Sequence, residues 1–226
     1  MTPVGVDQVK NSRNVTELKV KPGLFIAFEG IDGCGKSTQI QLLEDKLKKQ
    51  GYELVRIREP GGTQSGEEIR NVILKPRPEG LDAITEVLLY SAARAQLMSE
   101  IVRPAIQAGK AVLADRFAWS TLAYQGFGRG LPIDKIEGLI ELAIGDTWPD
   151  KTFILDLTVE ESRKRQDSRG EALDRLELEK NEFFEKVRQG YLHVANKYQN
   201  KVECLQAVDT VENIHKQIMT QVKELL

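Results

Sequence analysis

The chain has 226 residues, and its 32 Lys and Arg against 34 Asp and Glu give a formal net charge of −2. This near balance argues against a general nucleic-acid coat or a polybasic membrane binder, although it leaves room for a local basic cluster. No apolar run approaches the ~18 residues of a membrane-spanning helix, and the N-terminal residues lack the apolar stretch of a secretory signal. We therefore expect a cytoplasmic protein that has neither nucleic acid nor membrane as a partner.

The cysteines and histidines offer little catalytic chemistry. Cys34 and Cys204 lie far apart in the sequence and form neither a metal-binding spacing nor a disulfide framework. His193 and His215 lie in stretches that have the pattern of amphipathic helices. The chemistry is therefore expected to rest on Lys, Arg, Asp, Glu and backbone groups.

In chain order, the polar residues 1–21 show no sustained period, which predicts a disordered extension, and alternating strands and helices follow. Strands are predicted at 24–29, 53–58, 111–114, 151–157 and 202–207. Helices are predicted at 36–50, 65–74, 82–101, 117–124, 133–144 and 211–225, with a long polar helical stretch after 157 that breaks near Gly170. This alternation predicts an α/β fold in which helices cover both faces of a five-stranded parallel sheet.

Ligands of such sheets bind at the carboxyl ends of the strands, so the segments that follow the strands are the most informative. The first strand is followed by G-I-D-G-C-G-K-S, which fits the phosphate-binding pattern G-x-x-x-x-G-K-[ST] between a strand and a helix. Glycines let backbone N–H groups form a nest for phosphates, and the helix N-terminus adds a positive dipole end. The predicted ATP-binding residues are Gly30, Ile31, Asp32, Gly33, Cys34, Gly35, Lys36, Ser37 and Thr38.

Within this loop, Lys36 is predicted to reach the β- and γ-phosphates, and Ser37 to hold Mg²⁺. Cys34 has two interpretations. We favour a small residue that fills a tight turn, and the alternative is a reactive thiol whose modification blocks nucleotide binding.

The pattern alone does not distinguish kinases, GTPases and motor ATPases. The only Asn-Lys pair, Asn196-Lys197, is followed by Tyr198-Gln199 rather than by the Asn-Lys-x-Asp pattern of GTPases. The chain also lacks room for the added domains of a motor. A small-molecule kinase needs an acceptor site and a lid that excludes water, and several segments suit those tasks.

Two of these segments follow strands: R-E-P-G-G-T (58–63) follows the second strand, where an exposed turn would explain Pro-Gly-Gly alone, and 115–130 follows the third. Asp115 is predicted to orient Mg²⁺ and Arg116 to clamp an acceptor phosphate with two parallel hydrogen bonds, and the alternative is a surface ion pair between them. In the helix at 82–101, Tyr90 and Arg94 lie four residues apart and project from one face, which suits a flat base with polar edges. A core tyrosine beside a solvated arginine is an equally good interpretation of that pair.

A basic cluster follows the fourth strand, with members Arg163, Lys164, Arg165, Arg169 and Arg175. Charge runs are usually solvated helical faces. Here, however, the loop position after Asp32 is Gly33, so an arginine that stabilises the transferred group must come from elsewhere. We expect a short lid at about 163–175 to supply it.

Several separated motifs together resemble the thymidylate kinase family. They are EGIDGCGKSTQ (29–39), REPGGT (58–63), EVLLYSAAR (86–94), DRFAWSTLAYQG (115–126) and QGFGRG (125–130), in a resemblance that covers roughly 23–226. The resemblance implies a P-loop three-layer sandwich over 22–226 and transfer of the γ-phosphoryl group of Mg-ATP to dTMP in dTTP synthesis. It also implies a homodimer.

The resemblance further assigns roles to residues. It implies a dTMP site made by Asp32, Glu59, Pro60, Arg70, Tyr90, Arg94, Arg116, Ser120, Thr121, Tyr124 and Gln125. Tyr90 stands where many relatives have a stacking Phe, and Tyr124 would lie under the deoxyribose. Gly33 and the lid arginines place the chain with the bacterial type. The implied catalytic residues are Lys36, Arg116, Arg165 and Arg169, without a choice between the last two, and the implied metal ligands are Ser37 and Asp115.

Two alternatives remain open from the sequence. The first is another small P-loop kinase, which acts on a different nucleoside monophosphate or on a deoxynucleoside, with Glu59 as a base. The second is a regulatory module that binds ATP without transferring phosphate.

Overall fold

Five parallel strands form the centre of the computed structural model, which describes residues 23–167 and 174–226. The strands are β1 (Leu24–Glu29), β2 (Leu54–Arg58), β3 (Ala111–Asp115), β4 (Lys151–Asp156) and β5 (Val202–Gln206), in the order β2-β3-β1-β4-β5. The central strand β1 pairs with β3 on one side and with β4 on the other. The carboxyl ends of β1, β2 and β3 therefore lie next to one another, and the predicted motifs follow these ends.

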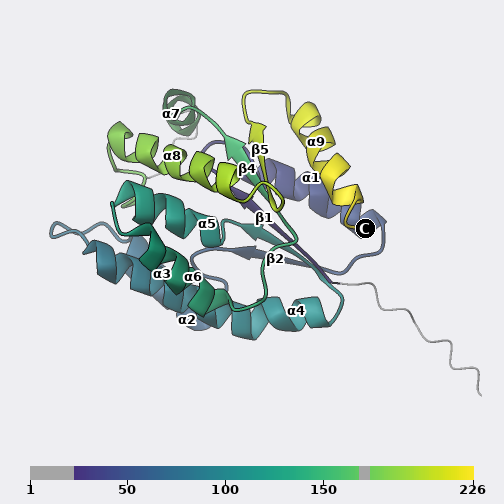
Figure 1. Ribbon diagram of the computed structural model, residues 1–226, viewed down its shortest axis with the longest axis horizontal. Helices are drawn as coiled ribbons and strands as arrows, with labels where there is room; N and C mark the ends of the chain where they lie inside the picture. Colours follow the sequence, from purple (N-terminus) through teal and green to yellow (C-terminus); the bar gives the residue numbers. More distant parts are fainter. Residues whose placement is uncertain (1–22, 168–173) are drawn as a thin grey trace, which may run out of the picture.

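Helices cover both faces of this sheet (Figure 1). The α-helices are α1 (Lys36–Lys49), α2 (Gln64–Leu74), α3 (Ala83–Leu97), α4 (Arg103–Gln107), α5 (Ala118–Thr121), α6 (Ile133–Ile144), α7 (Val159–Asp167), α8 (Asn181–Lys197) and α9 (Val211–Lys223). Two π-helical segments, η1 (Met98–Val102) and η2 (Leu122–Gly128), continue α3 and α5. Figure 1 shows α1 and α9 together on one side of the sheet, and α3, α6 and α8 on the other.

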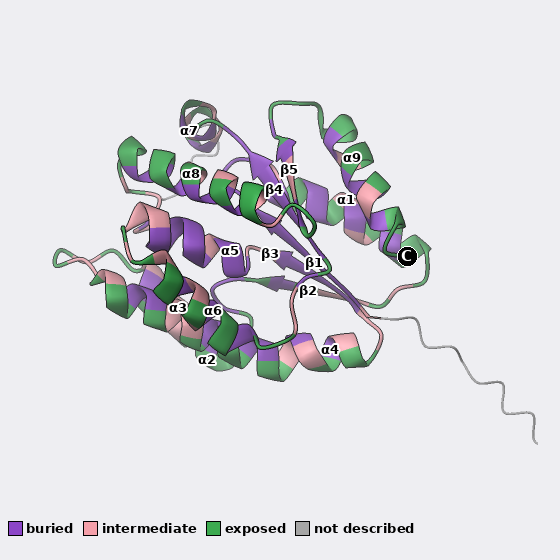
Figure 2. Ribbon diagram, viewed as in Figure 1, coloured by how far each residue is buried: buried purple, intermediate pink, exposed green. Residues whose placement is uncertain are grey.

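The core lies between these layers because the central residues of the middle strands are apolar. Every residue of β1 and of β4 is buried, as expected for strands covered on both faces (Figure 2). The N-termini of α2 and α3 are capped by the residues that directly precede these helices. Thr63 accepts a hydrogen bond from the Gly66 N–H, and Asp82 accepts two from the first turn of α3. The five parallel strands and the helices on both faces of the sheet confirm the predicted α/β architecture.

The structure corrects the end of one predicted helix. The prediction stopped the helix at residue 101, ahead of Pro104, yet helical structure continues through η1 and α4 to Gln107. The Arg103 N–H donates to the Met98 carbonyl five residues back, and Pro104 occupies the first turn of α4, where its missing N–H is tolerated. The helix predicted at 117–124 likewise continues through η2 to Gly128.

The long polar stretch after β4 forms α7 and α8. Of the predicted basic cluster, Arg163, Lys164 and Arg165 lie in α7, and Arg175 lies in a turn between the two helices. The predicted extension at 1–21, and the middle of the predicted lid with Arg169, lie outside the described residues. Within residues 23–167 and 174–226, none of the helices combines the length and the apolar character that a membrane crossing requires.

Candidate active site

The glycine-rich loop between β1 and α1 has the backbone geometry that its sequence predicts. Gly30, Gly33 and Gly35 all have positive φ, and α1 begins at Lys36 directly after Gly35. A Cβ on Gly30 would lie 2.5 Å from the Leu155 carbonyl oxygen of β4, so a side chain does not fit there. The turn therefore presents backbone N–H groups and a helix N-terminus at the carboxyl edge of the sheet.

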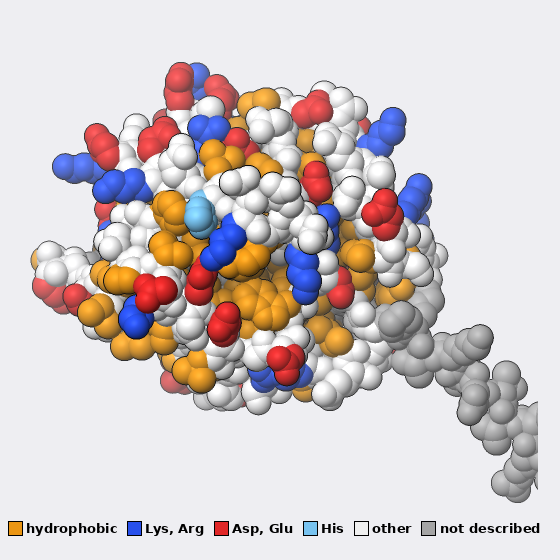
Figure 3. Space-filling view, viewed as in Figure 1, with side chains coloured by type: hydrophobic (Ala, Val, Ile, Leu, Met, Phe, Trp, Pro, Cys, Tyr) orange, Lys and Arg blue, Asp and Glu red, His pale blue; other side chains and the backbone are white. Residues whose placement is uncertain are grey.

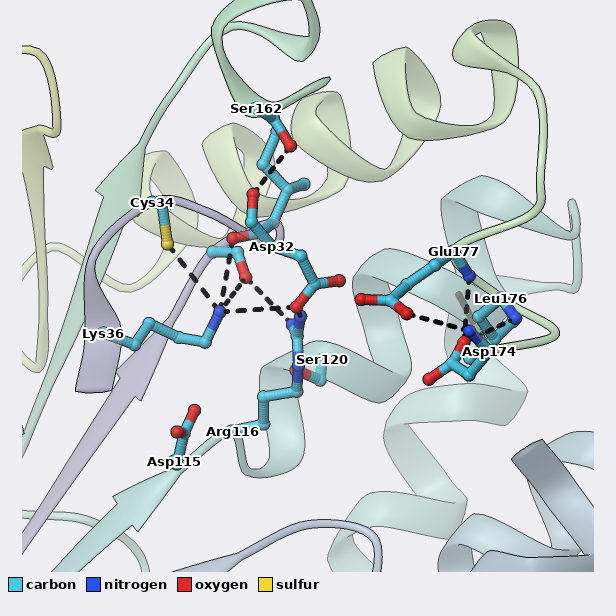
Figure 4. Close-up of polar contacts among 12 residues, drawn as sticks. Asp32, Cys34, Lys36, Asp115, Arg116, Ser120, Ser162, Asp174, Leu176 and Glu177 are labelled. Atoms are coloured by element: carbon cyan, nitrogen blue, oxygen red, sulfur yellow. Dashed lines mark hydrogen bonds and ion pairs between the residues drawn. The ribbon is translucent and has the colours of Figure 1, made fainter. Parts of the chain in front are cut away.

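Lys36 is 7% exposed, and its ammonium group lies inside this loop. Its Nζ donates to the carbonyls of Gly30 at 3.0 Å and Ile31 at 3.2 Å, and the Asp32 carboxylate lies 4.0 Å away (Figure 4). Two carbonyls and a carboxylate thus hold the cation where phosphates would approach the loop. Cys34 is buried beside it, with its Sγ 3.7 Å from Nζ, which favours the interpretation of Cys34 as a filler of the turn.

Ser37 and Asp115 bring two oxygen ligands together from α1 and the end of β3. The Ser37 hydroxyl donates to the Asp115 carboxylate at 3.3 Å, and both residues line the pocket. Oxygen atoms are the ligands that Mg²⁺ prefers, and Mg²⁺ is usually bound through one or two protein groups together with substrate phosphates and water. The described residues contain no cluster of three or more His, Cys, Asp and Glu suited to a metal. The donor set therefore fits a metal that arrives with a nucleotide.

Arg116 has positive φ (65°), a strained conformation for a residue other than glycine. It turns its guanidinium back over the phosphate loop, where it donates to the Gly30 carbonyl at 2.9 Å and to the Asp32 carboxylate at 2.5 Å (Figure 4). Burial alone would lower the pKa of Arg116, but the adjacent Asp32 carboxylate raises that pKa well above its ordinary value. Arg116 therefore presents a permanent cation to the pocket.

The carboxylate of Glu29, at the end of β1, supports this region from the sheet, a role that no sequence motif predicted. It is fully buried and accepts hydrogen bonds from the backbone N–H groups of Phe117 and Ser120 and from the hydroxyls of Ser120 and Tyr191. Burial raises the pKa of Glu29, although the Ser120 hydroxyl and the charge of Arg116 oppose that shift. The network ties the start of α5 to the end of β1 and so fixes the turn that carries Arg116.

Glu59 and Arg94 form a buried ion pair. The Glu59 carboxylate accepts from Nε of Arg94 at 2.9 Å and from Nη2 at 2.6 Å, and Nη2 also donates to the Phe117 carbonyl. Burial raises the pKa of Glu59, and the charge of Arg94 opposes this shift. The remaining nitrogen, Nη1 of Arg94, is buried and has no hydrogen-bond partner among the described residues. A buried donor without a partner is costly, so Nη1 is available to a ligand.

These groups surround one pocket of about 260 Å³. The structure brings the following predicted residues to its wall: Asp32, Gly33, Gly35, Lys36, Ser37, Thr38, Glu59, Pro60, Arg70, Tyr90, Arg94, Asp115, Arg116, Ser120, Thr121, Tyr124 and Gln125. The Thr121 and Tyr124 hydroxyls are two further buried atoms without partners in the described part of the chain. Burial raises the pKa of Tyr124 well above its ordinary value, so the hydroxyl stays protonated.

Four predicted residues do not line the pocket. Gly30, Ile31 and Cys34 shape the loop from within, and Arg165 donates to the backbone carbonyls of Gly33 at 3.2 Å and Ala207 at 3.1 Å. Arg165 therefore contacts the phosphate loop without facing the pocket, and its catalytic role stays a prediction, as does that of Arg169.

The pocket wall also includes five residues that were not among the predicted site residues: Arg58, which begins the REPGGT motif, and Leu74, Asp174, Leu176 and Glu177. Figure 4 shows the Glu177 carboxylate directed from the segment after α7 toward Asp32 and Arg116. Arg163 holds this segment by donating to the carbonyls of Glu177 and Glu179. In the sequence, this segment is marked by the acidic residues Glu177 and Glu179 after Arg175. Such a pattern is also typical of an exposed surface, so it did not predict a place in the pocket wall.

Comparison with known proteins gives one consistent family. The family model described as thymidylate kinase matches residues 28–218. The chain is 43% identical to the thymidylate kinase of Exiguobacterium sibiricum over 206 residues, which cover 89% of this chain and 97% of that protein. It is 44% identical to the thymidylate kinase of Caldanaerobacter subterraneus over 204 residues, or 90% and 97% of the two chains. A crystal structure of thymidylate kinase from Ehrlichia chaffeensis superimposes with a TM-score of 0.72 at 33% identity and covers 88% of this chain and 98% of that one.

Proposed function

Because this chain belongs to the thymidylate kinase family, we propose that it transfers the γ-phosphoryl group of ATP to the 5′-phosphate of dTMP, which yields dTDP for dTTP synthesis. One observation carries the proposal. The wall of one pocket contains the phosphate-loop residue Lys36, the guanidinium of Arg116 and the buried, unpartnered polar atoms of Arg94, Thr121 and Tyr124. One pocket therefore offers groups for a phosphate donor, an acceptor phosphate and a base.

In the proposed reaction, an oxygen of the dTMP phosphate forms a bond to the γ-phosphorus of ATP, and the bond from that phosphorus to the β,γ-bridging oxygen breaks. The acceptor is a phosphate monoester with a second pKa of about 6, so it is mostly a dianion at neutral pH and needs no general base. The absence of histidine from the wall of the described pocket is consistent with this chemistry. The main task is to bring two polyanions together.

Lys36 and Arg116 supply positive charge that would reduce the repulsion between the two polyanions. In the proposed complex, Lys36 exchanges its carbonyl contacts for the β- and γ-phosphates, and Arg116 binds the acceptor phosphate, with Arg70 nearby. Ser37 and Asp115 would hold Mg²⁺, which screens the phosphates and orients them. An arginine from the segment near 163–175, either Arg165 or Arg169, would stabilise the transferred group, and such arginines are worth roughly 10³- to 10⁵-fold in rate.

At the other end of the pocket, Arg94 and Gln125 would contact the thymine edge, and Tyr90 would lie against its face. Tyr124 would lie under the sugar, with Ser120 and Thr121 close by. Glu59 would act through Arg94 by orienting the guanidinium.

We further propose that residues 22–226 form one domain with a short lid, that the protein acts in the cytoplasm, where ATP and dTMP are available, and that it is a homodimer. Exposed apolar side chains on α3 and α6, two helices that pack against each other, support the last proposal.

A coupled assay of ADP release against a panel of nucleoside monophosphates and nucleosides tests the proposed function. We expect rapid ADP release with dTMP and little with purine monophosphates or thymidine. Activity with a deoxynucleoside alone would favour a nucleoside kinase. ATP binding without ADP release for any acceptor would favour a regulatory module, and either result would reject the proposal.

A further inference from the structure

The carboxylate of Glu86, in the first turns of α3, is completely buried and accepts hydrogen bonds from three side chains. Gln125 donates its Nε2 at 2.7 Å, Arg175 donates at 2.6 Å, and Arg129 lies across both oxygens at 3.3 Å. Two guanidinium groups thus neutralise the carboxylate, which makes its burial tolerable. Glu86 is not among the residues that line the pocket, but Gln125 is.

The contact between Glu86 and Gln125 determines which way the Gln125 amide points. A carboxylate flanked by two arginines can only accept hydrogen bonds, so the amide group that faces it must be the NH₂. The amide oxygen of Gln125 is therefore on the other side. That side is directed away from Glu86, and Gln125 itself lies in the pocket wall.

The pocket consequently presents a fixed pattern of polar atoms. Arg94 offers a donor, the unpartnered Nη1, and Gln125 offers an acceptor. The Watson–Crick edge of thymine carries the complementary pattern, an acceptor at O4 and a donor at N3–H. Cytosine carries the reverse pattern, a donor amino group at C4 and an acceptor at N3.

We propose that Glu86 is a positioning residue for base specificity: it locks the Gln125 amide so that the pocket accepts a 4-oxopyrimidine and rejects a 4-aminopyrimidine. This inference rests on the proposed function, because it concerns the acceptor base of that reaction. Rejection follows because a cytosine ring would bring two acceptors together at Gln125 and two donors together at Arg94.

Glu86 also accepts a hydrogen bond from Arg175, and this contact gives Glu86 a second role in holding the pocket wall in place. Arg175 donates to the Ile73 carbonyl as well as to Glu86 and thereby fastens the segment that carries Asp174, Leu176 and Glu177 to the end of α2. Loss of the Arg175 hydrogen bonds would displace this segment of the pocket wall without changing the orientation of the Gln125 amide. A test must therefore separate base specificity from general damage.

Glu86→Gln provides the test, because a glutamine at position 86 can donate as well as accept and so frees the Gln125 amide to turn. The readout is kcat/KM for dTMP, dUMP and dCMP. We expect the preference for dTMP over dCMP to fall by roughly 10- to 100-fold, the range expected for one mismatched hydrogen-bonding edge. The preference for dTMP over dUMP should stay unchanged, because these bases differ only by a methyl group.

Three further variants serve as controls. Glu86→Asp keeps an acceptor-only group and should retain the dCMP discrimination even if its rates fall. Arg175→Gln removes the fastening and should lower activity toward both pyrimidines without changing their ratio. In a Gln125→Ala background, Glu86→Gln should have no further effect on the ratio, because the residue through which it acts is gone.

If Glu86→Gln fails to fold, Glu86→Gln/Arg129→Gln restores the charge balance of the cluster and allows the same measurement. An unchanged dTMP-to-dCMP ratio in a folded variant would overturn the inference, as would an equal fall of that ratio in the Arg175→Gln control. Wild-type protein without activity on dTMP would instead reject the proposed function, so the two failures are distinguishable.

Discussion

Arg94 is among the most buried side chains of the described residues, yet one of its nitrogens has no partner. Its other nitrogens are fixed by Glu59 and by the Phe117 carbonyl, so the unpartnered group points in one direction. The sequence predicted that Arg94 shares a helix face with Tyr90, and both line the pocket. It could not predict the ion pair, because Glu59 lies 35 positions away in the chain.

Lys36 is the residue on which phosphate transfer depends most directly. Replacement by alanine removes the only side-chain cation within the loop, so we expect Lys36→Ala to lower kcat by roughly 10²- to 10³-fold or more. The measurement is ADP release at saturating substrates. Lys49→Ala, on the exposed end of the same helix, is the matched control and should have wild-type activity. Near-normal turnover by Lys36→Ala would contradict the assignment.

Arg116 is expected to act mainly on the acceptor. Arg116→Ala removes the charge-assisted hydrogen bonds that this guanidinium would donate to the acceptor phosphate, worth about 1.5–3 kcal/mol each, so the KM for dTMP should rise by roughly 10- to 100-fold. The KM for ATP should change much less. Initial rates with each substrate varied in turn make the comparison, and an equal rise in both constants would show that the guanidinium supports the whole loop instead.

Cys204 on β5 should be a slow nucleophile at neutral pH. Burial raises the pKa of this thiol to about 11, so its thiolate fraction should grow about tenfold per pH unit up to that value. Alkylation by iodoacetamide, followed by mass spectrometry, measures this dependence. The buried Cys34 should stay unlabelled in the folded protein. A labelling rate of Cys204 that levels off near pH 9 would be inconsistent with the burial of the group.

At the scale of elements, the sequence predicted the strands and most helices well because their apolar periods are local. The apolar pattern did not predict the extension of the helix past Ile101, because that extension passes through a π-helical turn before Pro104 enters the first turn of α4. The hydrogen bonds of Glu29 were also not predictable from local sequence. Its partners Ser120 and Tyr191 come from two helices that are distant in the chain, and the fold brings them together.

The contact between α8 and η2 gives a prediction for stability. A Cβ on Gly190 of α8 would lie 2.8 Å from the Cα of Ala123, so Gly190→Ala should push α8 away from the segment that carries Tyr124 and Gln125. We expect a loss of about 1–3 kcal/mol in the free energy of unfolding, measured with urea.

Gly138 is the matched control, because it lies in α6 with no atom within 4 Å of an added Cβ. Gly138→Ala should stabilise the protein by about 0.5–1 kcal/mol through helix propensity. Equal effects of the two substitutions would mean that close packing at Gly190 is unimportant.

At the scale of the whole molecule, the balanced total charge conceals dense clusters of paired charges. Charged side chains of both signs are spread over the surface in Figure 3, and the wall of the pocket combines five cations with five carboxylates: Lys36, Arg58, Arg70, Arg94 and Arg116 with Asp32, Glu59, Asp115, Asp174 and Glu177. The net charge of −2 therefore excluded a polyanion coat but was no guide to the pocket.

The exposed apolar side chains on α3 and α6 would form the interface of the proposed homodimer. Ile84 and Leu88 lie on one face of α3, and Leu142 of α6 is 83% exposed. Leu88→Glu should convert a dimer to a monomer in light scattering coupled to size-exclusion chromatography. Val208→Glu, at an exposed apolar residue after β5, should leave the dimer intact. A dimer that survives Leu88→Glu would place the interface elsewhere.

The most direct test of the proposed phosphoryl transfer follows a labelled phosphoryl group. The protein is mixed with ATP labelled at the γ-phosphorus and with dTMP, and the products are separated. We expect the label to appear in dTDP as its β-phosphate, in amounts equal to the ADP formed, and we expect Lys36→Ala to slow this transfer by the factor predicted for its kcat. Label released as inorganic phosphate, or dTMP recovered unchanged, would contradict the proposed transfer.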